Sequence, residues 1–188
     1  MTWAHAGYGS RGMAILHGWR TCPRCEGALE NDGARAVCLG TCGSTYYANS
    51  APCVSALIED RFGRLLLARR AIEPYLGLWD LPGGFLDEGE HPVDGLRREV
   101  LEETGLVGEP DRFVGTWMDV YGDAPDAAAT LILYWTVSLD DGEPVAADDV
   151  AEFRWFAADE LPGEDELAFT TLGDALAAWR AGKGKGSA

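Results

Sequence analysis

The sequence predicts an α/β protein in which helices pack on a mixed β-sheet, preceded by a small cysteine-containing module. Three observations support this fold class. Several stretches after residue 50 are rich in β-branched and aromatic residues, and two other segments have apolar residues at helical spacing. Four of the five cysteines lie within 21 residues, ahead of the first predicted strand.

The chain length supports one main domain with small additions. Its 188 residues suffice for a domain with its own core and an appendage. We expect an irregular N-terminal arm over residues 1–20 and the cysteine module over 21–48. The α/β domain is expected over 49–181, followed by a flexible tail over 182–188.

The predicted strands follow the β-rich stretches in order. The segments "CVSALIED" and "RLLLARR" are predicted as strands joined by the turn "EDRFG", and "LWDLP" is a short strand that ends at Pro82. Further strands are predicted in "RFVGTWMDVYG", "ATLILYWTVSL" and the start of "EFRWFAADELP". Strands of this number mixed with two helices indicate a sheet covered by helices.

A C-terminal helix is predicted in "TTLGDALAAWRAG". Thr171 and Asp174 have the spacing of a capping box, and Gly182 is expected to end the helix. One face of this helix carries apolar residues, namely Phe169, Leu172, Leu176 and Trp179.

The other predicted helix, from Pro92 to Thr104, carries an unusual set of acids. Glu99, Glu102 and Glu103 fall within about 100° of arc on one edge of it. Crowded carboxylates repel one another, and a hard divalent cation such as Mg²⁺ turns that repulsion into binding.

Neighbouring residues fit the same interpretation. Arg98 lies one turn before Glu102 and can pair with it, which would fix the direction of that carboxylate. Gly83 and Gly84 precede the helix and permit backbone conformations that expose carbonyl oxygens. Gly84 is therefore a further candidate ligand.

The spacing of these residues is specific. Gly84 is followed after five residues by Glu90, and after seven more by "REVLEETGL". This resembles the Nudix box of the Nudix hydrolase family, G-x5-E-x7-R-E-U-x-E-E-x-G-U with U apolar, and every fixed position matches. The resemblance implies an α/β/α sandwich with a mixed sheet. It also implies hydrolysis of a nucleoside diphosphate linked to another moiety, with Mg²⁺ or Mn²⁺.

The same resemblance assigns expected roles. The ligands of the catalytic metal would be Gly84, Glu99, Glu102 and Glu103, and Glu90 and Arg98 would orient the acids. A carboxylate takes the proton from the attacking water. A helix glutamate, Glu99 or Glu103, is favoured for this step, and Asp148, Asp149 and Glu152 stay open as alternatives.

The cysteine module has the spacing C-x2-C-x12-C-x3-C, formed by Cys22, Cys25, Cys38 and Cys42. Four thiolates at this spacing suit tetrahedral Zn²⁺, and with four protein ligands such a zinc is structural. A disulfide is the alternative, which an expected cytoplasmic location disfavours. The module resembles the zinc ribbon before the catalytic domain in some Nudix proteins, such as NADH pyrophosphatases.

The substrate is less well defined by the sequence. The S-Q-P-W-P-F-P-x-S segment of NADH pyrophosphatases is missing, so ADP-ribose or a related nucleotide sugar is favoured over NADH or (deoxy)nucleoside triphosphates. Candidate stacking residues for the substrate are Tyr75, Trp79, Phe85 and Tyr121. Outside the enzyme class, the alternatives are a nucleotide-sensing protein without turnover and a zinc-ribbon adaptor for RNA or protein. The acidic charge weighs against RNA.

Charge and hydropathy limit which partners the protein can have. The net charge of −16 disfavours nucleic acid, although a bound metal still allows a small anionic nucleotide. No apolar run approaches the length of a membrane span, and no signal-peptide pattern is seen, so a cytoplasmic location is expected. Homodimerisation through the cysteine module stays open.

Overall fold

The computed structural model describes residues 15–122, 127–147 and 149–183. Among the described residues, one compact unit holds 15–50 and 127–128, and the other holds 51–122, 129–147 and 149–183. Residues 1–14 of the expected arm and 184–188 of the expected tail lie outside the described residues. No described helix combines the length and apolar character that crossing a bilayer requires.

The smaller unit is a three-stranded antiparallel sheet. Its strands, in spatial order, are β1 (Leu29–Asn31), β2 (Arg35–Cys38) and β3 (Thr45–Tyr47). Few apolar side chains are buried here, and two of the four buried ones are the cysteines Cys22 and Cys38. A unit this small usually needs a metal or disulfides for stability, so its cysteines are the natural stabilising element.

The larger unit contains a four-stranded mixed sheet in the order β7-β4-β9-β8. Strand β4 pairs in parallel with β9 and antiparallel with β7. The strands are β4 (Ala51–Ile58), β7 (Gly83–Phe85), β8 (Gly108–Tyr121) and β9 (Ala128–Leu139). The pairing of β7 with β4 fixes Gly83 and Gly84, the first two residues of β7, against the middle of the domain. These two residues are called the glycine turn below.

A second sheet of three antiparallel strands has the order β10-β5-β6. Its strands are β5 (Leu65–Arg70), β6 (Trp79–Asp80) and β10 (Val150–Phe156). The adjacent stretches "CVSALIED" and "RLLLARR" are both strands, as predicted, and they lie in different sheets.

Helix α1 (Pro92–Thr104) has the predicted bounds. His91 is the N-cap, where its Nδ1 accepts the Val93 N–H at 3.3 Å, and Gly105 ends the helix with φ 72°. A Cβ at Gly95 would collide with the Leu86 side chain, which explains a glycine in mid-helix. Close packing between the helix and the preceding loop therefore outweighs the low helix propensity of glycine.

Helix α2 (Thr170–Lys183) follows the short helix η1 (Glu164–Glu166). The predicted capping box is wrong, because Thr171 lies inside the helix rather than before it. Asp119 of β8 acts instead: its Oδ2 accepts the Thr171 N–H at 2.9 Å and the Thr171 hydroxyl at 2.8 Å. Gly182 does not end the helix, which continues to Lys183.

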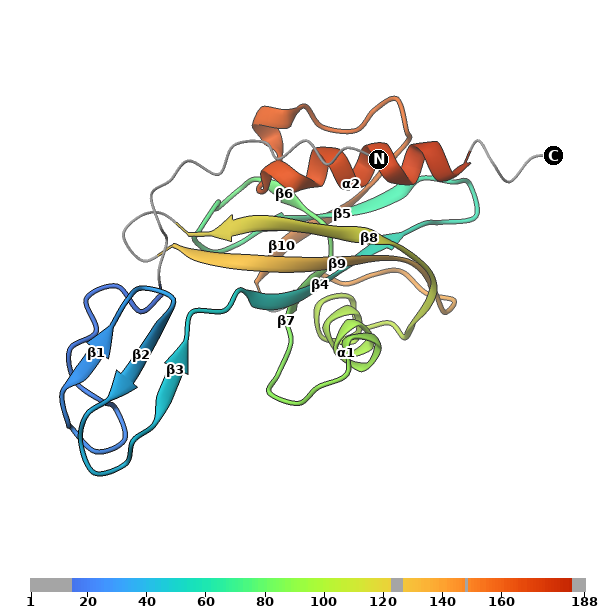
Figure 1. The fold of residues 1–188 in the computed structure, drawn as a ribbon. Helices are drawn as coiled ribbons and strands as arrows, with labels where there is room; N and C mark the ends of the chain where they lie inside the picture. The colour runs from blue at the N-terminus through green and yellow to red at the C-terminus, as the bar shows by residue number, and fades with distance from the viewer. Residues whose placement is uncertain (1–14, 123–126, 148, 184–188) are drawn as a thin grey trace. The chain divides into compact units, whose positions relative to one another are not determined.

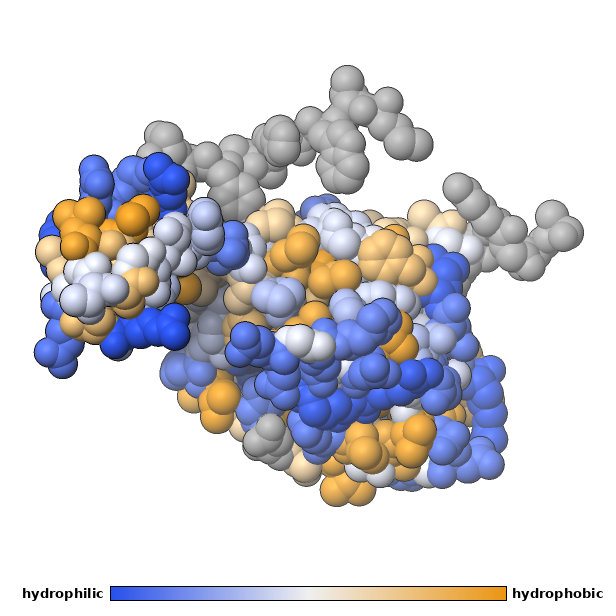
Figure 2. All heavy atoms as spheres, turned by 60° about the horizontal axis from the view of Figure 1, so that its bottom comes forward, coloured by the Kyte–Doolittle hydropathy of each residue, from blue (hydrophilic) through white to orange (hydrophobic). Residues whose placement is uncertain are grey.

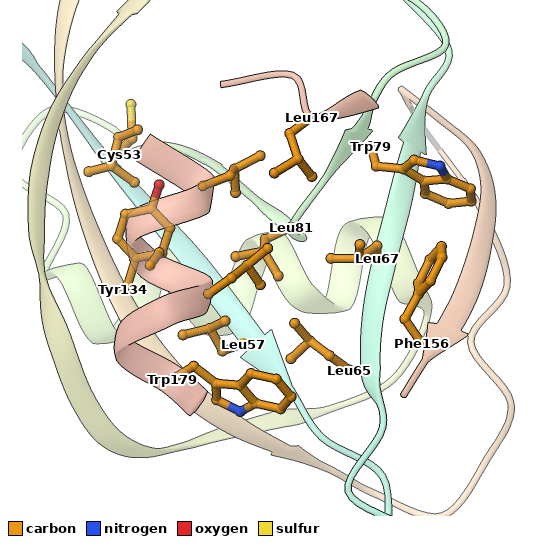
Figure 3. Packing of buried hydrophobic residues seen from close by; sticks show 14 residues of the cluster. Cys53, Leu57, Leu65, Leu67, Trp79, Leu81, Tyr134, Phe156, Leu167 and Trp179 are labelled. Carbon is orange, nitrogen blue, oxygen red and sulfur yellow. The ribbon is translucent and has the colours of Figure 1, made fainter. Parts of the chain in front are cut away.

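The two helices cover opposite sides of β4, giving the predicted α/β/α sandwich (Figure 1). Successive residues of β4 point to alternate faces. Leu57 packs in the cluster of α2, whose Leu172, Leu176 and Trp179 are buried there (Figure 3). The other cluster joins three residues of β4 to α1, namely Val54, Ala56 and Ile58 with Leu96 and Val100.

Candidate active site on the β7 turn and helix α1

The glycine turn and α1 meet at two specific contacts. The Gly83 N–H donates to Glu103 Oε2 at 3.1 Å. A Cβ at Gly84 would lie 2.6 to 2.7 Å from all three atoms of the Glu99 carboxylate. Gly83, at φ 149°, has no room for a side chain either, because a Cβ there would collide with the Val54 carbonyl. The glycines thus let the backbone of β7 touch the acids of α1.

Arg98 organises the acidic edge of α1. Its guanidinium donates to Glu99 at 2.7 Å and to Glu102 at 3.1 Å. It also makes a bidentate pair with Glu90 and donates to the Phe85 carbonyl at 3.1 Å. The predicted pairing of Arg98 with Glu102 is confirmed, and the structure adds three further partners. This one side chain therefore ties the loop after β7 to three carboxylates.

Glu103 is the most deeply placed of the three predicted metal acids. It is buried, and this burial raises the pKa of its carboxyl to about 9, with Asp149 and Asp80 adding to the effect. Burial also raises the pKa of the Glu99 carboxyl, while the Arg98 contact opposes the rise. Both carboxylates are therefore costly to ionise where they stand, and a bound cation would relieve that cost.

The chemistry of these donors fits a hard divalent cation. The side chains offer carboxylate oxygens, and the adjacent turn offers the backbone oxygen of Gly84. Figure 2, which brings the lower side of Figure 1 forward, shows a broad band of hydrophilic side chains on this unit. In the described residues, however, the only group of three or more histidine, cysteine, aspartate or glutamate side chains that lies close enough together to hold a metal ion is the four cysteines of the smaller unit. Arg98 holds Glu99 and Glu102, whereas Glu103 turns to Gly83.

The candidates for the general base are placed differently. Asp148 lies outside the described residues. Glu152 forms an ion pair with Arg69 at 3.0 Å on the surface. Burial is the main cause of the raised pKa values of Glu99 and Glu103, and the Asp149 charge adds to both, so Asp149 lies near the acidic edge.

An open pocket adjoins this edge, with about 450 Å³ of empty space that includes open solvent. Gly83 and Gly84 line it, so the pocket and the acids share the glycine turn. Its remaining lining residues are Cys53, Val54, Ser55, Arg70, Asp80, Leu81, Phe85, Tyr121, Thr130, Ile132, Tyr134 and Phe169. Planar apolar walls beside a polar site are typical of a ligand pocket.

Comparison with known proteins identifies this arrangement. A model of the NUDIX domain matches residues 49–176. The chain belongs to the Nudix family. It is similar to an ADP-ribose pyrophosphatase of Methanocaldococcus jannaschii, with 31% identity over 123 residues, 65% of this chain and 69% of that protein.

Two further comparisons agree. An RNA pyrophosphohydrolase of Cereibacter sphaeroides is 32% identical over 127 residues, 58% of this chain and 77% of that protein. A crystal structure of a NUDIX hydrolase from Nitrosomonas europaea matches with a TM-score of 0.73 and 26% identity, covering 89% of this chain and 94% of the other. The protein is thus a Nudix hydrolase, and residues 84–106 are its Nudix box.

The predicted substrate aromatics of this Nudix hydrolase have separate locations. Phe85 and Tyr121 line the pocket and pack edge to face, with ring centroids 5.1 Å apart. Tyr75 lies beside them and packs edge to face on Phe169, also at 5.1 Å. The prediction that Trp79 stacks on the substrate is wrong. Trp79 is buried in the core against Phe156, so it does not offer a stacking face.

Several pocket residues were not predicted from the sequence. Phe169 stacks on Tyr121 at 6.1 Å, and the ion pair of Arg70 with Asp80 spans 3.2 Å. Burial raises the pKa of Asp80 to about 6, although Arg70 opposes this rise. These residues are far apart in the chain. The "WDLPGG" segment places Asp80 close to Gly84, and that proximity was the one available signal.

The smaller unit brings the four predicted cysteine ligands together. Their Sγ atoms lie within 4.8 Å of one another, and no disulfide joins them. Gly27 and Gly40 allow the two cysteine turns to approach, since a Cβ on Gly27 would lie 2.7 Å from the Gly40 Cα. The Tyr46 hydroxyl is 3.3 Å from Cys22 Sγ. Four converging thiols are suited to bind one metal ion.

Proposed function

We propose that the protein hydrolyses the pyrophosphate bond of a nucleoside diphosphate linked to another moiety, with ADP-ribose or a related nucleotide sugar as the favoured substrate. The observation that carries the proposal is the Arg98 network. It holds Glu90, Glu99 and Glu102 beside the glycine turn within an intact Nudix box. A binding-only protein has no need of this arrangement of acids.

The acids have a defined part in this chemistry. Gly84, Glu99, Glu102 and Glu103 would hold Mg²⁺ or Mn²⁺, which neutralises pyrophosphate charge and stabilises the transition state. Arg98 keeps Glu99 and Glu102 directed along one edge of α1. Glu90 holds Arg98 in turn, so these two residues position the acids rather than touch the reacting atoms.

A helix glutamate remains our proposed general base. Glu103 is buried against the turn and accepts the Gly83 N–H, which limits its freedom. Glu99 is partly exposed and contacts the turn at Gly84. Either carboxylate, once ionised, can take a proton from a water molecule at the turn.

Two lines of support favour a nucleotide sugar. The similar protein from M. jannaschii is named as an ADP-ribose pyrophosphatase. The net charge of −16 weighs against a polyanionic RNA substrate, although the C. sphaeroides relative is named as an RNA pyrophosphohydrolase. We therefore propose a small nucleotide as the partner.

We further propose that Cys22, Cys25, Cys38 and Cys42 bind one structural zinc ion. Four protein ligands leave no open position on the metal, so its contribution is to the stability of the smaller unit. The deeply placed Cys38 thiol has its pKa raised to about 12 by burial, and metal binding would deprotonate it.

The test of the enzymatic proposal is a product-resolved screen. Purified full-length protein is incubated with Mg²⁺ or Mn²⁺ and, separately, ADP-ribose, NADH, UDP-glucose or deoxynucleoside triphosphates. The proposal expects AMP and ribose 5-phosphate from ADP-ribose as the fastest reaction. A preference for NADH or triphosphates would reject the substrate, and tight binding without turnover would reject the enzymatic proposal.

A further inference from the structure

We propose that the pocket beside the acidic edge binds a nucleobase that carries an exocyclic amino group, and that Thr130 and Asp80 recognise its polar edge. This inference rests on the proposed function for the identity of the ligand as a nucleotide. It concerns which base is accepted, and it adds two specificity-determining residues that lie outside the Nudix box.

The strongest evidence is the hydroxyl of Thr130. Thr130 is 2% exposed, and its Oγ1 has no hydrogen-bond partner among the described residues. A buried hydroxyl without a partner destabilises a protein, and valine of the same shape would avoid the cost. Thr130 is one of the residues that line the pocket, so a ligand there can supply the missing partner.

The position of Thr130 in the sheet directs it into the pocket. Thr130, Ile132 and Tyr134 alternate along β9 and therefore point to one face. All three line the pocket. On the neighbouring strand, Cys53 pairs with Ile132 and belongs to the same lining. Thr130 is thus a polar residue on a largely apolar floor.

The walls suit a planar ring. Phe85, Tyr121 and Phe169 line the pocket together, and Phe85 keeps 41% of its surface exposed. Tyr121 and Phe169 are nearly parallel, with an interplanar angle of 22°. Aromatic faces next to a polar catalytic edge favour a stacked base over a sugar, since every base offers a π-face.

Asp80 supplies a hydrogen-bond acceptor in the same pocket. Its Oδ2 accepts from Arg70 Nη1 at 3.2 Å, and its Oδ1 accepts the Leu81 N–H at 2.8 Å. A carboxylate has about four acceptor positions, so these two bonds leave capacity for a ligand donor. An ionised phosphate has no hydrogen to donate to this carboxylate, whereas an amino group donates to it. Asp80 therefore selects for a base with an amino group.

The location of the pocket connects base binding to hydrolysis. The pocket and the acidic edge share Gly83 and Gly84. A nucleotide whose base occupies the pocket can therefore present its phosphates at the glycine turn. Adenine fits this requirement, and so do guanine and cytosine, because each carries an amino group.

The test uses three ligands and calorimetry on the full chain. The ligands are AMP, purine riboside 5′-monophosphate, which lacks the amino group, and ribose 5-phosphate, which lacks the base. Wild-type protein should bind AMP about tenfold tighter than the purine riboside, and ribose 5-phosphate weakest. Equal affinity for AMP and ribose 5-phosphate would overturn the proposal.

Two variants assign the residues. Thr130→Val should weaken AMP binding about fivefold to tenfold, the effect of one lost hydrogen bond, while the melting temperature stays equal or rises. Asp80→Asn should reduce the preference for AMP over purine riboside monophosphate. Thr136→Val is the matched control on β9, since the Thr136 hydroxyl contacts the Arg112 carbonyl outside the pocket. Wild-type AMP affinity in Thr130→Val would overturn the role of Thr130.

A parallel hydrolysis assay keeps this inference separate from the enzymatic proposal. Hydrolysis of nucleotide sugars with AMP affinity unchanged in Thr130→Val would reject the base pocket alone. Thr130-dependent AMP binding in a protein that hydrolyses none of the tested nucleotides would support the pocket and reject the enzymatic proposal.

Discussion

Arg98 and Glu90 form a bidentate ion pair, in which Nε donates to Oε1 and Nη2 donates to Oε2, both at 2.9 Å. The Arg98 contact lowers the pKa of the Glu90 carboxyl to about 2, so the pair persists across the physiological range. A planar guanidinium makes two parallel hydrogen bonds that an ammonium group does not reproduce. The geometry of this pair fixes where Glu99 and Glu102 point.

Arg98→Lys is therefore expected to lower kcat/KM about tenfold to a hundredfold, because the residues that orient metal ligands have effects of this size. Steady-state kinetics with ADP-ribose would measure it. Arg97→Lys is the control one residue away, since Arg97 pairs with Glu109 at the surface. Equal kinetics for the two variants would contradict the positioning role of Arg98.

Gly84→Ala is expected to reduce activity while leaving the fold intact. The added Cβ displaces the Glu99 carboxylate, which is the mobile end of a side chain, so the melting temperature should change little. We expect a loss of about tenfold or more in kcat/KM, since misplacement of a catalytic group by about 1 Å costs up to a hundredfold. Gly173→Ala in α2 is the control, because its Cβ would meet no described atom within 4 Å. Full activity in Gly84→Ala would argue against the contact.

Glu103 predicts a pH dependence of stability for the metal-free protein. Its carboxyl has a folded-state pKa of about 9 against an ordinary value of 4.5, because burial disfavours the charge. The folded state thus holds a proton that the unfolded chain releases. The contribution of Glu103 to the free energy of unfolding is therefore most favourable below the ordinary pKa, where both states are protonated. It becomes less favourable as the pH rises toward 9.

Glu103→Gln should remove this pH-dependent loss of stability, since the neutral amide needs no proton. We expect the free energy of unfolding of the variant to exceed that of wild type at pH 8 by several kcal/mol, on the order of 3–5. Urea unfolding in EDTA at pH 5, 6.5 and 8 measures the difference. Glu102→Gln, at an exposed position of the same helix, should keep the wild-type slope. Parallel pH profiles for wild type and Glu103→Gln would refute the prediction.

The cysteine cluster predicts about one zinc per chain in protein purified without chelators. Cys38→Ser is expected to lower the zinc content and destabilise the smaller unit, because a structural metal stabilises the fold that binds it. Cys53→Ala is the control, since Cys53 lies on β4 apart from the cluster. Elemental analysis of the variants decides the matter, and zinc-free wild-type protein would reject the assignment.

Local signals made much of the fold predictable. Helix α1 has the predicted bounds because the backbone dihedrals of Pro92 favour the start of a helix and those of Gly105 end it. The box acids could likewise be placed from spacing alone, since three-residue and four-residue offsets share one helix edge. What depends on neighbours in the chain was accessible from the sequence.

Long-range contacts were not predictable in the same way. Asp119 caps α2 from 52 positions away, and nothing near Thr171 indicates it. Trp79 and Tyr121 look equivalent as aromatic residues. Only the pairing of β6 with β5 and the contact of Trp79 with Phe156 of β10 show that Trp79 belongs to the core. Thr130 and Phe169 reached the pocket through sheet register and helix placement, neither of which the sequence displays.

The most direct test of the central claim compares wild-type protein with Glu102→Gln in the release of AMP from ADP-ribose at saturating Mg²⁺. Glu102 is half-exposed on α1, so the substitution should leave the melting temperature close to that of wild type. We predict Mg²⁺-dependent AMP release by wild type and a loss of at least about a hundredfold in the variant. Equal turnover by both proteins would contradict the assignment of the acidic edge of α1 as the catalytic site.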